Sequence, residues 1–426
     1  MTCWKNDAGS DAAGAWVWWP VAVKPASAVF LLLLFGSGFA SSVNGQPDPR
    51  DWQSVLQEAR QQTVFFNAWG GEARINNYLA WVSNEVEVRF GVDLRHVKLA
   101  DTATSVSRIL AEKQAGNTTA GTVDLLWVNG ENFAALKTNG LLFGPWAEQI
   151  PNFALVNAER FPEVRQDFTV PVQGLESPWL RAQLVFYYDS AVIAQPPGSI
   201  PALLDWSRRH PGEFTYPKPP DFLGTTFLKQ AILELRQNTA PLYAPVEQAD
   251  FAAITQVLWD YLDQLHPTLL RRGRYFPANG AQLRRLMADG DTALAFSFSP
   301  GEAVTAIANR ELPASVRSYV LDGGTLSNVS FLAIPFNARS KAAAMVVSNF
   351  LLSPEAQARA TRSDQMGSFT ALDLDRLPAS AQALFEQIER SGAAPSQADL
   401  NRKLPEPHPS WVPALEAAWL QRYSVR

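Results

Sequence analysis

The chain has 426 residues, a formal net charge of −5, and 47% apolar against 18% charged residues. This composition excludes disordered, collagen-like and disulfide-scaffold proteins. The mild acidity argues against a nucleic-acid partner, because a general nucleic-acid binder usually carries a basic face. We therefore expect one or two sizeable cores, divided into two or three domains or lobes.

The first 45 residues differ from the rest of the chain. Lys24 precedes an unbroken apolar run over residues 28–35, and small residues follow, with Gly38 and Ala40 at the spacing of a cleavage site. A basic flank, a short apolar core and small residues are typical of a secretory signal peptide, and the run is too short for a spanning helix. The pattern predicts a signal peptide over residues 1–45 and a periplasmic protein, with an uncleaved anchor as the alternative.

Two details of this leader matter. Acidic and tryptophan side chains such as Asp11 and Trp16 are unusual before an apolar run, so we expect translation to start further downstream. Cys3 is the only cysteine and precedes the run, which argues against a lipid-anchored protein. The exported chain would then keep its net charge of −5 and depend on packing rather than on disulfides.

From residue 51 onwards, helical and strand patterns alternate. Apolar residues recur every three or four positions over 75–90, which predicts one face of a helix. The expected elements are a helix over 51–62, a strand over 63–69, the helix over 75–90, a strand over 92–99, a helix over 102–114 with Asp101 as N-cap, a strand over 122–129 and a short helix to 137. This alternation predicts a mostly parallel sheet covered by helices.

Prolines and glycines then interrupt the chain around a strand-like run at 184–188, and alternation resumes beyond them. The later elements are expected as a strand over 214–216, a helix within 222–235, a helix over 251–265, a helix over 281–287, a strand over 292–298 and a helix over 341–352. Ser353 and Pro354 predict the N-cap and first position of one more helix. The simplest interpretation is an α/β protein with two lobes joined near 172–184, each lobe a mostly parallel sheet flanked by helices.

Motifs for catalysis, metals and cofactors do not occur. The four histidines lie far apart in sequence, without metal-ligand spacing. Nucleophile-elbow, P-loop and dinucleotide-binding fingerprints are also missing. We therefore predict no catalytic residue, no metal site and no cofactor, although a Ser–His or paired-carboxylate hydrolase stays open because its residues need not be adjacent in sequence.

Aromatic and polar residues gather where predicted strands end. The run from Asn67 to Glu72 follows the first strand, and the run from Trp127 to Asn132 follows the third. In open parallel sheets, ligands bind beyond the carboxyl ends of the strands, against helix N-termini. These loops therefore predict a ligand cleft. The alternative is that Trp69 and Trp127 cover the surface of the lobe while the glycines form turns.

Two further segments carry candidate residues. Glu176 and Trp179 lie at the expected junction of the lobes, and Asp221 precedes a helix as either its N-cap or a ligand contact. Glu302 follows Ser299 at capping-box spacing and is expected to be structural. A cleft that combines tryptophans with carboxylates suits a cationic or amine-like ligand.

The sequence resembles the extracellular solute-binding proteins of bacterial ABC importers, in a branch related to the thiamine-, polyamine- and iron-binding members. The segments that carry the resemblance are TVFFNAWGGEARINNYLAWV (63–82), TVDLLWVNGENFAALK (122–137), VPVQGLESPWLRAQLVFYYD (170–189), FTYPKPPDFLGTTFL (214–228), FLAIPFNARSKAAAMVVSNFLLSPEAQAR (331–359) and EPHPSWVPALEAAWLQRY (406–423). They run across nearly all of the chain beyond the leader.

The resemblance implies a type II, two-lobe Venus-flytrap receptor that closes around a small solute and delivers it to a membrane permease of the importer, acting as a monomer. Lobe 1 would comprise 46–178 and 327–367, and lobe 2 would comprise 179–326 and 368–426. The hinge crossings would fall near 172–184, 321–331 and 366–370. The identity of the solute stays open.

By position, the resemblance also implies the residues that line the cleft. Those of the first lobe would be Asn67, Trp69, Gly70, Trp127, Asn129 and Glu131; those of the hinge, Glu176 and Trp179; and those of the second lobe, Asp221, Gly224 and Thr225, with Ser297 and Asn328 in addition. Some enzymes of this fold use a cysteine nucleophile, which the exported chain lacks. The alternative function is therefore a secreted hydrolase or transferase without a thiol.

Overall fold

The computed structural model describes residues 46–362, 364–387 and 392–424. The predicted signal peptide, its cleavage site and the expected downstream start lie outside these residues. Within them, no helix combines the length and the apolar character needed to cross a membrane.

The larger sheet has seven strands in the order β11-β6-β10-β3-β1-β2, with β12 paired to β10. The strands are β1 (Thr63–Trp69), β2 (Asp93–Leu99), β3 (Leu125–Val128), β6 (Glu176–Gln183), β10 (Thr325–Ala333), β11 (Phe369–Thr370) and β12 (Lys403–Leu404). β1 pairs in parallel with β2 and β3, as the alternation of strands and helices predicts. β10 runs antiparallel to both β3 and β6.

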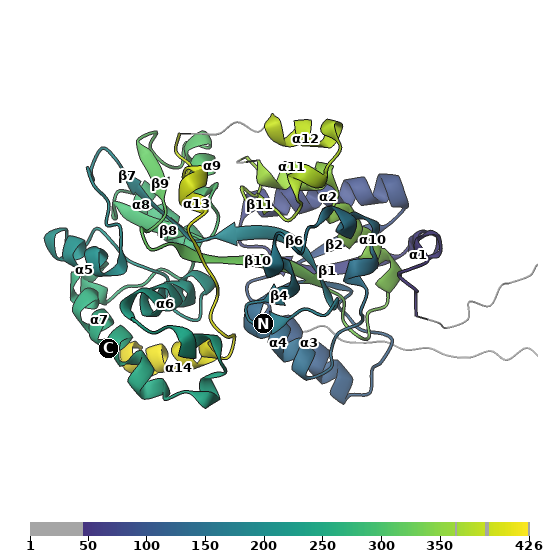
Figure 1. Ribbon diagram of the computed structural model, residues 1–426, viewed down its shortest axis with the longest axis horizontal. Helices are drawn as coiled ribbons and strands as arrows, with labels where there is room; N and C mark the ends of the chain where they lie inside the picture. The colour runs from purple at the N-terminus through teal and green to yellow at the C-terminus, as the bar shows by residue number, and fades with distance from the viewer. Residues whose placement is uncertain (1–45, 363, 388–391, 425–426) are drawn as a thin grey trace, which may run out of the picture. The chain divides into compact units, whose positions relative to one another are not determined.

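Helices cover this sheet and enclose the first apolar core (Figure 1). They are α1 (Trp52–Ala59), α2 (Ala73–Phe90), α3 (Ala103–Gln114), α4 (Gly130–Thr138), α10 (Lys341–Leu351), α11 (Pro354–Thr361) and α12 (Ala379–Glu386). Ser353 caps α11 as predicted, accepting a hydrogen bond from the amide of Ala356. Asp101 accepts from the amide of Ala103, although the N-cap position of α3 itself is Thr102.

The smaller sheet has three strands in the order β8-β7-β9, which are β7 (Val185–Asp189), β8 (Leu294–Ser297) and β9 (Val316–Tyr319). Both pairings are antiparallel, which corrects the expectation of a mostly parallel sheet in each lobe. The apolar run over 292–298 predicts a buried strand, but it carries no information about the direction of its neighbours.

Helices of the later half enclose a second apolar core with this sheet (Figure 1). They are α5 (Ile200–Arg209), α6 (Phe222–Leu235), α7 (Phe251–Leu265), α8 (Gly280–Ala288), α9 (Glu302–Ala308) and α14 (Trp411–Tyr423), with α13 (Gln397–Leu400) near β12. The strand expected over 214–216 does not form. Phe214 and Tyr216 are fully buried because they pack on Phe227, without a strand ladder.

Short elements complete the chain. A hairpin joins β4 (Gln166–Asp167) to β5 (Val170–Pro171). The 3-10 turns are η1 (Ala147–Gln149), η2 (Pro151–Leu155), η3 (Pro162–Arg165), η4 (Ala240–Tyr243), η5 (Val246–Gln248), η6 (His266–Thr268), η7 (Leu270–Gly273) and η8 (Leu374–Arg376).

Two neighbouring strands connect the cores. β6 and β10 run side by side through the middle of Figure 1, and the amide of Leu184 donates to the carbonyl oxygen of Leu326 at 2.8 Å. Ala371 and Ala381 still belong to the first core, whereas Trp411 belongs to the second. A third passage between the cores therefore lies after Ala381, and the residue bounds of the two lobes stay a proposal.

Candidate functional site

The loop after β1 is shaped by close backbone packing. A Cβ atom at Gly70 would lie 2.5 Å from the Cβ of Lys98, so a side chain does not fit there. Asn67 is buried and donates from Nδ2 to the Oγ of Ser105 at 2.9 Å, which ties β1 to α3. Trp69 is half-buried at the end of the strand. Of these predicted ligand residues, Trp69 and Gly70 are partly exposed, whereas Asn67 is buried.

Trp127 and Trp179 meet edge to face, with ring centroids 4.9 Å apart. Trp127 is half-buried, but Trp179 is fully buried and also contacts Phe66 in the first core. Glu176 is fully buried too, at the start of β6. The two predicted hinge residues therefore lie inside the protein in this structure, without a surface for a ligand.

The N-terminus of α4 is hydrogen-bonded to the β4–β5 hairpin. Gly130 has φ +62°, and its amide donates to Oδ1 of Asp167 at 2.8 Å. A Cβ atom at Gly130 would lie 2.8 Å from the ring of Phe168, so only glycine allows this close approach. Asn129 occupies the N-cap position and Glu131 the first turn of the helix, and both are half-buried.

The N-terminus of α6 lies in the second core. Asp221 caps the helix, since its carboxylate accepts from the amides of Leu223 at 3.0 Å and Gly224 at 3.4 Å. Burial raises the pKa of Asp221 to about 6, although both amide bonds lower it. Thr225 donates from Oγ1 to the Oε1 of Glu416 on α14 at 2.7 Å. The N-cap interpretation of Asp221 is therefore confirmed.

One turn further along α6, Lys229 forms a buried ion pair. Its Nζ lies 2.7 Å from Oε2 of Glu406, and the two side chains are 2% and 1% exposed. The second oxygen of Glu406 accepts from Nδ2 of Asn328 at 3.2 Å. The ammonium also lies 4.6 Å from the ring centroid of Phe168 and 5.8 Å from that of Phe222.

These contacts bring four carboxyl groups around one lysine. We call Glu131, Asp167, Glu406, Glu416 and Lys229 the acidic cluster. Asp167 lies within electrostatic reach of Glu131, Glu406 and Lys229, and Glu416 within reach of Glu131 and Lys229. The cluster joins elements of both cores and includes the contacts of three predicted residues, Glu131, Thr225 and Asn328.

Burial and mutual repulsion change the ionisation of the cluster. Burial raises the pKa of Asp167 well above its usual value, and Glu131 and Glu406 raise it further, against the amide of Gly130 and the ammonium of Lys229. Burial also raises the pKa of Glu131, and that of Glu416 to about 7. Oδ2 of Asp167 is buried and has no hydrogen-bond partner within the described part of the chain. The cluster can therefore accept a proton or a cation.

A second group of charges, which we call the ion network, joins α2 to α8 and α9. Arg74 binds Glu72 at 2.5 Å and also binds Glu302, while Arg284 binds Glu72 at 2.7 Å, Glu302, and Glu311 at 3.0 Å. The predicted capping box at Glu302 is wrong, because α9 has Gly301 at its N-cap and no side-chain cap bond. The side chains of the four central residues are at most 18% exposed, so each charge depends on its partners.

Ser297, the remaining predicted residue, lies at the end of β8 and is 8% exposed. Its Oγ accepts a hydrogen bond from the amide of Ser299 at 3.1 Å. Ser299 in turn donates from its own hydroxyl to the carbonyl oxygen of Met366 at 3.1 Å. In this structure the hydroxyl of Ser297 thus shapes the turn that leads into α9.

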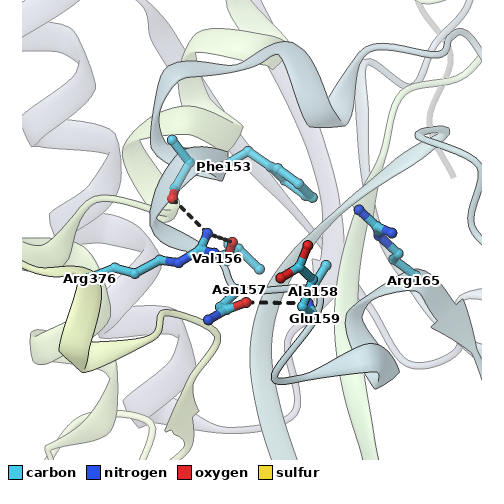
Figure 2. A pocket seen from close by; sticks show the side chains of 8 residues that line it. Phe153, Val156, Asn157, Ala158, Glu159, Arg165 and Arg376 are labelled. Carbon is cyan, nitrogen blue, oxygen red and sulfur yellow. Dashed lines mark hydrogen bonds between the residues drawn. The ribbon is translucent and has the colours of Figure 1, made fainter.

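A pocket of about 190 Å³ lies elsewhere, beside η2 and η8. Figure 2 shows Arg376 on one side of it and Arg165 on the other. Arg376 donates to the carbonyl oxygens of Ala154 and Val156, so its guanidinium already holds the loop. No residue predicted to bind ligand lines this pocket.

Sequence reasoning missed Asp167, Lys229, Glu406 and Glu416. Lys229 and Glu406 are 177 residues apart, and Thr225 and Glu416 are 191 apart, so no local pattern connects them. The strongest signal in the sequence is the segment 406–423, which resembles the family but contains no local pattern that marks Glu406 or Glu416 as a site residue. Over residues 46–362, 364–387 and 392–424, no group of three or more His, Cys, Asp or Glu residues has the arrangement needed for a metal ion.

The sequence of this chain is similar to those of known proteins. Residues 81–373 match the family of bacterial extracellular solute-binding proteins. Protein YnjB of Escherichia coli (strain K12) is 46% identical over 376 residues, which cover 88% of this chain and 94% of that protein.

Solved structures show the same fold. A putative spermidine/putrescine ABC transporter from Listeria monocytogenes aligns with a TM-score of 0.61 at 16% identity, covering 85% of this chain and 98% of that one. The spermidine/putrescine substrate-binding protein PotD from Streptococcus pneumoniae aligns with a TM-score of 0.60 at 14% identity, covering 85% and 99%. These likenesses confirm the predicted two-lobe type II fold. The chain therefore belongs to the bacterial extracellular solute-binding proteins, as its sequence predicts, and its family is one of binding proteins rather than of enzymes.

Proposed function

We propose that this protein is the periplasmic solute-binding component of an ABC importer, and that its solute is a small organic cation held at the acidic cluster. The observation that carries the proposal is the pair Glu131 and Glu416. Neither side chain forms an ion pair with any residue that the structure describes, yet each is half-buried and they repel one another. Two carboxyl groups that have no ion-pair partner of their own form a site for a cation.

The positions of Glu131 and Glu416 also support the proposal that a bound solute favours the closed form of the protein. Glu131 lies on α4, whose Phe133 and Leu136 belong to the first core, whereas Glu416 lies on α14, whose Leu415 belongs to the second. Repulsion between the two carboxylates opposes the approach of the cores, and a cation between them replaces repulsion by two attractions. Binding would therefore favour the closed form, which would present the solute to the permease.

Other predicted residues complete the site in this proposal. Trp69, Trp127 and Asn129 keep partly exposed side chains at the ends of β1 and β3 and would supply an aromatic face and a polar contact. The buried Asn67, Glu176 and Trp179 would support the site from behind. Two structures of similar fold carry the names of spermidine/putrescine transport proteins, which is compatible with an amine solute. Export through the leader over residues 1–45 and action as a monomer belong to the same proposal.

Calorimetry on a protein of residues 46–426 tests the proposal, with a panel of ammonium compounds and with neutral and anionic compounds of equal size. Glu131→Gln and Glu416→Gln should each weaken cation binding about tenfold or more, because each removes one charge from a partly buried pair. Glu87→Gln, an exposed substitution on α2, is the matched control and should leave affinity unchanged. Unchanged affinity in both cluster variants would overturn the proposal.

A further inference from the structure

The ammonium group of Lys229 makes the contacts that the ammonium group of a bound amine would make. Its ammonium lies 2.7 Å from Glu406, faces the ring of Phe168 at 4.6 Å, and is 2% exposed. Attraction between ammonium groups and aromatic faces, combined with a carboxylate, is how proteins recognise organic amines. The lysine therefore fills one cation position of the acidic cluster with a group of the protein itself.

Once Lys229 is paired with Glu406, three carboxyl groups of the acidic cluster remain. Glu406 is neutralised by Lys229 and also accepts from Asn328. Asp167 is fully buried, and burial raises its pKa well above the usual value, which favours the protonated form of this carboxyl group. Glu131 and Glu416 remain, and burial raises the pKa of both, that of Glu416 to about 7. Burial therefore favours the protonated form of these groups, so the negative charge left for a solute is smaller than the number of carboxyl groups.

We propose that Lys229 determines the charge of the solute: its ammonium occupies one cation position of the acidic cluster, so that the site accepts a solute with a single positive charge and discriminates against a diammonium compound. This inference rests on the proposed function, since it concerns the same site. A second ammonium group in the solute would be desolvated beside the ammonium of Lys229, whose carboxylate partner Glu406 is already paired.

A purely structural ion pair would predict a different environment. Lys229 and Glu406 satisfy one another, so such a pair needs no other ionisable group nearby. Here Lys229 also interacts electrostatically with Glu131, Asp167 and Glu416. In addition, Oδ2 of Asp167 has no hydrogen-bond partner in the described structure. The cluster thus holds more carboxyl groups than Lys229 requires, which is the arrangement of a binding site.

The first experiment uses Lys229→Met, which keeps an unbranched side chain and removes the charge. Butylammonium and 1,4-diammoniobutane are the probes, and calorimetry measures the ratio of their affinities. The wild type should prefer the monoammonium probe, and the variant should shift the ratio about tenfold or more towards the diammonium, because Glu406 is then free to pair with it. An unchanged ratio would overturn the inference.

The second experiment uses Lys229→Ala, which removes three methylene groups and the ammonium. Propylammonium matches the deleted atoms and should raise the melting temperature of this variant in a saturable manner, whereas 1-propanol should not. The double variant Lys229→Ala with Glu406→Gln lacks the carboxylate and should lose the effect of propylammonium. No difference between propylammonium and 1-propanol would show that the position is not an amine site. If Lys229→Ala fails to fold with or without the amine, the affinity ratio of Lys229→Met decides.

The outcomes separate this inference from the proposed function. If the wild type binds no ammonium compound but Lys229→Met binds the diammonium probe, the proposed solute is wrong while the role of Lys229 stands. If the wild type binds the monoammonium probe and Lys229→Met retains the same ratio, the proposed function stands and Lys229 does not determine solute charge.

Discussion

We expect the ion network to hold the two cores in contact. Arg74 and Glu72 belong to the segment around the start of α2, whereas Arg284 and Glu302 lie on α8 and α9. Glu302→Gln leaves two arginines with Glu72 as their main partner in a site where the side chains are 6–18% exposed. Breaking a buried ion pair by removal of one partner costs about 3–5 kcal/mol, and partial exposure and the remaining carboxylate reduce this to about 2–4 kcal/mol.

This cost applies only while the cores are in contact, because separation returns the arginines to water. Glu302→Gln should therefore enlarge the radius of gyration of the solute-free protein in X-ray scattering and lower its melting temperature. Glu311→Gln is the control within the same network: Glu311 is 43% exposed and contacts Nε of Arg284 and the side-chain amide of Asn309, so its loss should cost less than about 1 kcal/mol. Identical scattering and melting of the two variants would show that the ion network does not hold the cores in contact.

Two other predictions concern the acidic cluster and α6. Cation affinity should rise from about pH 6 to about pH 8, because the carboxylate of Glu416, whose pKa burial raises to about 7, forms over this range beside Glu131, Lys229 and Asp101. The same raised pKa makes the solute-free protein less stable as pH rises towards 7, since the folded state then holds a proton that the unfolded state has lost. Calorimetry should show that Glu416→Gln abolishes most of the rise in affinity, and a flat wild-type profile would contradict this assignment. Gly224→Ala should destabilise the protein by about 1–3 kcal/mol in thermal melting. The added Cβ would lie 2.3 Å from the carbonyl oxygen of Pro217; an unchanged melting temperature would mean that this loop moves freely.

Local patterns predicted most of the elements. The strand over 63–69 and the helix at Ala73–Phe90 follow from β-branched and aromatic residues and from 3.6-residue periodicity, both of which depend on neighbours in sequence. The expected strand over 214–216 failed because a buried aromatic run records burial and not the presence of a hydrogen-bonded neighbour. The antiparallel direction of the strands in the smaller sheet could not be predicted for the same reason.

The candidate site was predictable only in part. Glu131 and Asp221 precede or begin helices, where sequence gives a clear signal, and the structure places them there. Trp179 and Glu176 stand in a proline- and glycine-rich segment that indicates an exposed junction, yet β6 lies between β10 and β11 and is covered by the first core. Pairs such as Lys229 with Glu406 depend on tertiary packing, which one sequence does not reveal.

The charge of the natural solute is the property on which the proposed site at Glu131 and Glu416 depends. Protein secreted with its own leader, purified gently and then denatured, should release its bound solute for mass spectrometry. We expect an unmodified organic molecule with one positive charge at neutral pH, present in wild-type protein and depleted in Glu416→Gln. An anionic or uncharged solute, retained equally by both proteins, would contradict it.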